Sequence, residues 1–142
     1  MPSASSEIVI KRPREDVFAF LADPENDLQW RGGVLDIERV SGSGVGARYA
    51  QGVKGPGGRR IPADIEITEL RRGELIAFRT IAGPVRPRGR YVLTAVDDGT
   101  HVRFELTADM KGLKRLMTPM VQKTMSNEVG QLEQLKRTIE RR

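Results

Sequence analysis

Few residues of this chain stand in the patterns that catalysis or cofactor binding requires. The segment Gly42–Ala47 (GSGVGA) has the glycine spacing of a dinucleotide-binding loop, but such a loop needs a following helix to hold the pyrophosphate. The residues from Arg48 to Val53 have instead the composition of a strand, and a second glycine-rich segment follows at 55–58. We therefore interpret Gly42–Ala47 as a hairpin turn, and the sequence predicts no bound cofactor.

The composition also argues against a metal centre and against a nucleophilic triad. His101 is the only histidine, and the chain has no cysteine, whereas metal sites bring several nitrogen, oxygen or sulfur ligands together. His101 alternates with apolar residues, so we expect it on the solvent-facing side of a strand with Arg103 and Glu105. No G-x-S-x-G motif accompanies it. We expect no metal.

Two arginines, Arg79 and Arg90, fall within strand-like patterns, and one of them could point inward. A buried arginine needs a carboxylate partner or an anionic ligand, and the outward orientation is favoured because charged side chains are mostly exposed. A catalysed reaction would need an inward acid or base. The nearby candidates are Arg90, Tyr91 and Asp64, and no pattern marks any of them as catalytic, so the catalytic residues stay unknown.

Aromatic residues give a clearer indication of a binding site. Trp30, the only tryptophan, offers a large apolar area and one hydrogen-bond donor. Four further aromatic residues fall in expected strands, at positions that could line a cavity: Tyr49, Phe78, Tyr91 and Phe104. Core packing is an equal alternative for each, because pockets and cores use the same residue types. For Tyr91 the alternation leaves open whether Val92 is the inward member.

Residues 110–142 carry an apolar stripe at steps of three and four, the spacing of a helix. Every methionine except the initiator lies in this stretch, and these soft, unbranched side chains suit a surface that fits ligands of variable shape. Pro119 either kinks one long helix there or separates two shorter ones. The predicted cavity wall consists of Met117, Met120, Val121 and Met125, whereas Val129 to Ile139 is expected to be core.

The elements that would position these residues follow from alternation and turn signals. A first strand over 7–12 precedes two short helical segments, the first opened by Pro13 and the second over 24–30. Six strands follow, over 34–40, 47–53, 61–70, 75–81, 90–96 and 101–108. An antiparallel sheet with one apolar face must cover that face, and the C-terminal helix is the only element large enough.

Length and charge set the remaining bounds. The 142 residues suit one domain spanning 1–142. The longest apolar run, Val17 to Ala22, is too short for a membrane span, and with no secretory pattern and no cysteine we expect a cytoplasmic protein. A net charge of +5 is compatible with nucleic acid as a partner. The basic residues are, however, dispersed among acids and not interleaved with aromatics, which disfavours that partner.

With this order of elements, the chain resembles the START-like (SRPBCC) superfamily, which includes polyketide cyclases and dehydratases, the major birch-pollen allergen and lipid-transfer domains. The segments that carry the resemblance are IVIKRPREDVFAF at 8–20, LQWRGGVLDIERV around Trp30, GVGARY at 44–49, DDGTHVRFEL at 97–106, and the long terminal helix. It implies an α+β helix-grip fold, in which a curved antiparallel sheet of about seven strands wraps a long C-terminal helix. It also implies a hydrophobic cavity between them and no cofactor.

We therefore expect binding, transport or sequestration of a hydrophobic small molecule, lipid-like or polyketide-like, at the aromatic and methionine positions named above. Two alternatives stay open. One is a polyketide cyclase, aromatase or dehydratase that uses the same cavity. The other is a protein-interaction module that acts on a macromolecular partner through its basic surface. No residue set marks one characterised branch of the superfamily, and no pattern indicates an oligomeric state.

Overall fold

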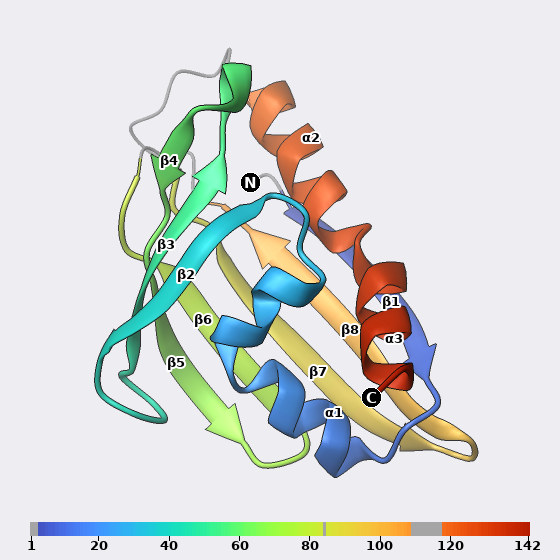
Figure 1. Cartoon of the computed structure of the whole chain (residues 1–142). Coiled ribbons are helices and arrows are strands. Elements are labelled where there is room, and N and C mark those ends of the chain that lie inside the picture. The colour runs from blue at the N-terminus through green and yellow to red at the C-terminus, as the bar shows by residue number, and fades with distance from the viewer. Residues whose placement is uncertain (1–2, 84, 109–117) are drawn as a thin grey trace.

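The computed structural model describes residues 3–83, 85–108 and 118–142. Within these ranges one antiparallel sheet has the strand order β1-β8-β7-β6-β5-β3-β2, with β4 paired to β3. Figure 1 shows this sheet curving around the C-terminal helices, as the helix-grip prediction requires. The strands are β1 (Ser3–Ile10), β2 (Val34–Ser41), β3 (Arg48–Lys54), β4 (Arg60–Pro62), β5 (Ile65–Arg71), β6 (Leu75–Thr80), β7 (Arg88–Val96) and β8 (Gly99–Thr107).

Five helical segments accompany the sheet in the described residues. They are α1 (Arg14–Leu21), the 3₁₀ segments η1 (Pro24–Gln29) and η2 (Pro56–Gly58), α2 (Thr118–Val129) and α3 (Leu132–Glu140). Pro13 immediately precedes α1, and the Asp23 carboxylate accepts a hydrogen bond from the Glu25 N–H at 3.1 Å to begin η1. None of these helices combines the length and hydropathy that a membrane span requires.

Strand β8 shows how alternation separates the core from the outer face. Its inward residues Val102, Phe104 and Leu106 are buried, whereas the alternate residues are only half-buried. His101 lies on the outer face with Arg103 and Glu105, as predicted, and its Nε2 is 3.7 Å from a carboxylate oxygen of Glu7 on β1. The outer face is therefore a charged, solvated ladder, and the concave face forms the core.

Most strand ends differ from the predictions by two residues or fewer, as at β7 and β8, which begin at Arg88 and Gly99. Two strands differ more. The first strand begins at Ser3 rather than at residue 7, because its serine-rich start pairs with the end of β8. The prediction of a single strand over 61–70 was wrong. This segment forms two strands, β4 and β5, and both pair with β3. At the division, the Ala63 N–H donates to the Gln51 carbonyl and the Gln51 N–H donates to the Asp64 carboxylate. The Asp64 side chain thus replaces a strand hydrogen bond.

The C-terminal helix is interrupted at Gly130. Pro119 is the second described residue of α2, and the predicted helix before Thr118 lies outside the described residues. The kink or break expected at Pro119 therefore stays a prediction. Gly130 and Gln131 separate α2 from α3, as the low helix propensity of glycine favours. The apolar stripe nevertheless continues across the break, with six buried residues: Val121, Met125, Val129, Leu132, Leu135 and Ile139.

The segment Gly42–Ala47 is the hairpin turn that was predicted. It joins β2 to β3, and no helix follows it. Gly42, Gly44 and Gly46 have φ angles of 73°, 65° and 90°, a region that glycine adopts without strain. A dinucleotide site is thereby excluded at this loop, because the helix that would hold a pyrophosphate is absent there.

Candidate ligand-binding cavity

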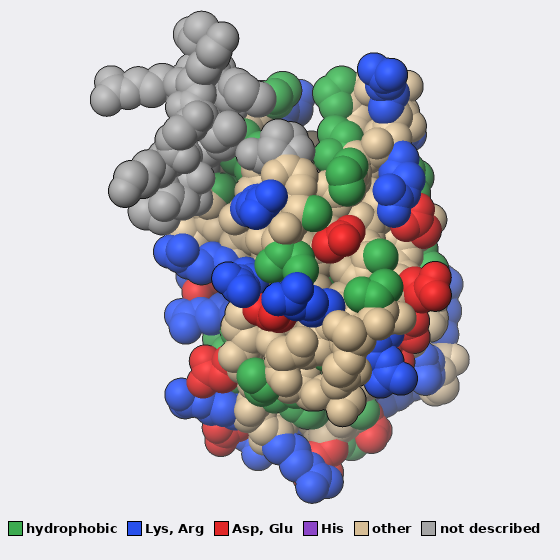
Figure 2. Space-filling model, turned by 90° about the vertical axis from the view of Figure 1, so that its left-hand side faces the viewer, with side chains coloured by type: hydrophobic (Ala, Val, Ile, Leu, Met, Phe, Trp, Pro, Cys, Tyr) green, Lys and Arg blue, Asp and Glu red, His purple; other side chains and the backbone are tan. Residues whose placement is uncertain are grey.

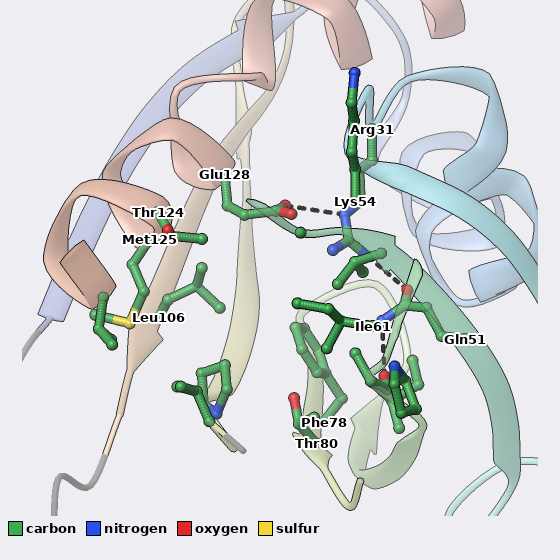
Figure 3. Close-up of a pocket in the computed structure, with 18 of the residues that line it drawn as sticks. Arg31, Gln51, Lys54, Ile61, Phe78, Thr80, Leu106, Thr124, Met125 and Glu128 are labelled. Carbon is green, nitrogen blue, oxygen red and sulfur yellow. Dashed lines mark hydrogen bonds and ion pairs between the residues drawn. The ribbon is translucent and has the colours of Figure 1, made fainter. Parts of the chain in front are cut away.

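A cavity of about 530 Å³ lies between α2 and the concave face of the sheet (Figure 3). One wall is helical: Val121, Met125 and Glu128 recur at steps of four and three on α2 and so share one side of the helix. The opposite wall is formed mainly by apolar residues of the sheet and its loops, namely Val53, Ile61, Ile65, Phe78, Val85, Pro87, Phe104 and Leu106. The cavity is thus predominantly apolar.

Five of the predicted contact residues line this cavity: Phe78, Phe104, Met120, Val121 and Met125. Met120 is half-exposed, with 52% of its surface accessible, whereas Val121 and Met125 are buried. Met120 therefore stands at the rim of the cavity and the other two stand deeper. Met117 lies outside the described residues.

Trp30, Tyr49 and Tyr91 do not line the cavity. Trp30 packs its ring edge against Phe104, with centroids 6.4 Å apart, and Tyr91 stacks on Phe104 at 4.4 Å. Both therefore support the cavity wall from behind. Tyr49 belongs to a separate core cluster under β2, β3 and β5, together with Ile37 and Ile65. The inward member of the 91–92 pair is Tyr91, which is 4% exposed.

Arg79 and Arg90 both point outward. Arg79 pairs with Glu66 at 2.8 Å and Arg90 pairs with Glu105 at 2.9 Å, and each arginine side chain is more than half exposed. Neither faces the cavity, in agreement with the favoured orientation. The inward arginine is Arg31, a residue that no sequence pattern had singled out.

Arg31 lies at the inner end of the cavity, held by side chains from three elements (Figure 3). Its Nη1 donates to Asp27 of η1 at 2.9 Å and to the side-chain oxygen of Gln51 on β3 at 3.1 Å. Its Nε donates to Glu128 of α2 at 3.1 Å. Gln51 is fixed in turn, because its amide nitrogen donates to the Ala63 carbonyl at 2.9 Å. We call Asp27, Arg31, Gln51 and Glu128 the polar cluster.

Burial shapes the protonation of the polar cluster. Asp27 is only 6% exposed, and desolvation raises its pKa from 3.8 to about 6 against the opposing effect of Arg31. Burial disfavours the charge of Arg31, but the carboxylates of Glu128 and Asp27 outweigh it and raise the Arg31 pKa, so the guanidinium stays charged. The Trp30 indole lowers the Asp27 pKa slightly, although its Nε1 makes no hydrogen bond to a described residue. Burial also raises the pKa of Tyr91 well above 10, which keeps the phenol neutral.

Two signals in the sequence could have indicated the polar cluster. Asp27 and Arg31 are four residues apart, the spacing at which oppositely charged side chains meet on a helical turn. Glu128 directly precedes Val129 of the apolar stripe, which places a carboxylate at its edge. The convergence of both on Gln51 depends on strand pairing and could not be inferred from spacing.

The three residues considered for acid or base catalysis are placed differently. Arg90 is on the outer face, and Tyr91 is buried behind Phe104. Asp64 accepts a hydrogen bond from the Gln51 backbone and does not line the cavity. The ionisable groups that do line it near its inner end are Arg31 and Glu128. Within the described residues, no group of His, Asp and Glu side chains converges in a way that could hold a metal ion.

The curved sheet, the helix that it grips and the cavity between them define a START-like helix-grip domain, as the sequence resemblance implied. The chain belongs to the family described as polyketide cyclase / dehydrase and lipid transport, whose model matches residues 1–140. No match emerged among curated proteins.

Solved structures agree on the fold. TTHA0849 from Thermus thermophilus superposes with a TM-score of 0.81 at 23% identity, over 99% of this chain and 98% of that one. A START superfamily protein from Mycobacterium smegmatis gives 0.78 at 15% identity, over 98% and 97%. The di-domain ARO/CYC StfQ from the steffimycin biosynthetic pathway gives 0.77 at 14% identity, over 99% of this chain and 51% of that one. At these identities the likeness establishes the fold.

Proposed function

We propose that this protein binds a hydrophobic small molecule in the cavity between α2 and the sheet. The observation that carries the proposal is the cavity itself, since about 530 Å³ of largely apolar space falls within the range of roughly 300–1,000 Å³ typical of small-molecule sites. Family membership supports it, because the family is described by polyketide chemistry and lipid transport. Both are roles in which an apolar molecule occupies the protein.

The lining suggests how binding would be driven. Phe78, Phe104 and Leu106 offer flat and branched apolar surface, while Met120 and Met125 adapt to ligand shape. Each Å² of apolar surface removed from water contributes about 25 cal/mol, less the entropy of ordering the ligand and the side chains. Removal of apolar surface from water is therefore the main driving force.

The test compares two tryptophan variants on the same helix. Met120→Trp narrows the rim of the cavity, whereas Asn127→Trp places the same bulk on an exposed residue outside the lining. We expect Nile red to bind the wild type and Asn127→Trp with equal affinity, and Met120→Trp at least several-fold more weakly. Native mass spectrometry of the purified protein should show a retained small molecule. If Nile red fails to bind the wild type and no molecule is retained, the proposal is overturned.

A second candidate function, cyclase- or dehydratase-type catalysis in the same cavity, is favoured by one observation. Arg31 and Glu128 both line the cavity and contact each other at 3.1 Å. A carboxylate can remove a proton next to a ketone, and a guanidinium can stabilise the enolate oxygen that forms. Hydrogen–deuterium exchange of acetylacetone, followed by NMR, tests this step. Acceleration by the wild type and not by Glu128→Gln would support it, and no acceleration would rule it out for this substrate.

The protein-interaction alternative finds less support on the outer surface. On the face that Figure 2 shows, Lys and Arg side chains are interspersed with Asp and Glu rather than gathered into one patch. Arg60, for example, forms two hydrogen bonds of 2.8 Å with Asp36. Such pairing reduces the positive potential that a basic docking surface would need.

A further inference from the structure

One nitrogen of the polar cluster is left without a partner. A guanidinium has five N–H donors, and Arg31 uses three of them, on Asp27, Gln51 and Glu128. Nη2, with its two N–H groups, has no acceptor among the described residues. Figure 3 shows this remaining nitrogen pointing into the space between α2 and the sheet. Arg31 lines the cavity, and although only 10% of its side chain is exposed, Nη2 is not among the fully buried atoms without a partner. The exposed part of the guanidinium therefore includes these donors.

Nη2 therefore keeps surface that a molecule in the cavity can reach. A hydrogen bond to a charged donor is stronger than one between neutral groups, so a ligand oxygen that accepts from Nη2 adds to the affinity. The guanidinium of Arg31 is also held rigidly, because side chains from η1, β3 and α2 accept hydrogen bonds from its other three N–H groups. A ligand acceptor would therefore meet a fixed donor at the inner end of an apolar cavity. This arrangement selects for a ligand with one polar atom at its end.

The charges around Arg31 decide which acceptor fits. The carboxylates of Asp27 and Glu128 already flank the guanidinium, at 2.9 Å and 3.1 Å, so its positive charge is compensated. A ligand carboxylate or phosphate would add a further negative charge close to both in a poorly solvated site, which is unfavourable. Lys54 also lines the cavity, but its side chain runs away from the Arg31–Glu128 pair in Figure 3.

From these contacts we infer that the cavity selects apolar ligands bearing a neutral carbonyl oxygen, which accepts a hydrogen bond from Arg31 Nη2, over acids of the same shape. The inference rests on the proposed binding function and adds to it the chemical class of the ligand. It excludes free fatty acids and other carboxylates as the preferred occupants. Ketones, esters and amides of apolar molecules fit the site.

Three probes of nearly equal shape separate the contributions of apolar burial, of the hydrogen bond and of a negative charge to the affinity. They are 2-acetylnaphthalene, which carries a ketone, 2-isopropylnaphthalene, which has no acceptor, and 2-naphthoate, which carries a carboxylate. Dissociation constants are measured by displacement of Nile red from the full chain. We expect the ketone to bind roughly tenfold more tightly than the hydrocarbon, the worth of one hydrogen bond to a charged group, and more tightly than the carboxylate.

The Arg31→Lys variant tests the assignment to Nη2. A lysine ammonium keeps the positive charge beside Asp27 and Glu128, but its three donors match the three acceptors already present, so none is left for the ligand. We expect the preference for the ketone over the hydrocarbon to disappear while the hydrocarbon still binds. Arg79→Lys, on the exposed outer face, is the matched control and should keep the preference.

The outcomes separate the two proposals. If the hydrocarbon binds but the ketone gains nothing over it, or if 2-naphthoate binds as well as the ketone, the inference fails while the binding function stands. Retention of the ketone preference in Arg31→Lys would also overturn the assignment. If none of the three probes binds the wild type, the binding function fails and the inference fails with it.

Discussion

Replacing Asp27 by asparagine tests the electrostatics of the polar cluster most directly. Burial raises the pKa of Asp27 from 3.8 to about 6, so the folded state holds this proton more tightly than the unfolded chain does. The resulting stabilisation is fully present below the unfolded pKa, near pH 4, and is lost as the pH rises through 6. A shift of about two units corresponds to about 3 kcal/mol. The asparagine side chain has no proton to lose in this range and is indifferent to pH.

The measurement is the free energy of unfolding in urea at pH 4, 5, 6 and 7, followed by the fluorescence of Trp30, the only tryptophan. The stability of Asp27→Asn relative to the wild type should rise by about 2–2.5 kcal/mol from pH 4 to pH 7, because pH 4 lies just above the unfolded pKa of 3.8. Asp36→Asn is the control: Asp36 is exposed, and its hydrogen bond with Arg60 lowers its pKa, so its contribution is lost only below about pH 4. If the difference in free energy of unfolding between Asp27→Asn and the wild type does not change with pH across this range, the reasoning is refuted.

Three further predictions concern stability and are checked by thermal or urea denaturation. Arg31→Leu leaves two carboxylates without their cation and should lower the free energy of unfolding by about 3–5 kcal/mol. Arg79→Leu, on the exposed face, should lower it by less than about 1 kcal/mol. Equal effects of the two variants would show that the polar cluster is not buried in solution. Phe104→Ala removes a ring that is 1% exposed and stacked on Tyr91 at 4.4 Å, and should cost about 3–5 kcal/mol. Gly83→Ala would bring a Cβ to 2.3 Å from the Pro62 carbonyl oxygen at φ 92°, so it should destabilise more than Gly44→Ala, where φ is 65° and nothing lies within 4 Å.

The fold could be predicted where one face of an element is consistently apolar. In β8 the alternation of Val102, Phe104 and Leu106 with charged residues fixes both the strand and its inward face. The hairpin turn at Gly42–Ala47 could also be predicted, because its three glycines favour the positive φ angles of a turn. The division of 61–70 into two strands could not be predicted, because it depends on hydrogen bonds from Gln51 of another strand.

The cavity wall was partly predictable, and the reason is again local. Val121 and Met125 follow from helical spacing alone. Residue type does not reveal whether an aromatic ring touches a cavity or supports a ring that does, so Tyr91 and Phe104 looked equivalent in the sequence. Only the stacking of Tyr91 behind Phe104 distinguishes them.

The polar cluster has a physical consequence that connects stability to binding. At neutral pH the ionised Asp27 lies in a poorly solvated site, and the raised pKa means that this charge weakens the fold by about 3 kcal/mol. Apolar side chains of similar volume would often pack there without such a penalty. A cavity that served only as an apolar container would gain nothing from the arrangement. A cavity that fixes a carbonyl group requires a rigid, charge-compensated donor at its inner end, and Arg31 between Asp27 and Glu128 supplies one.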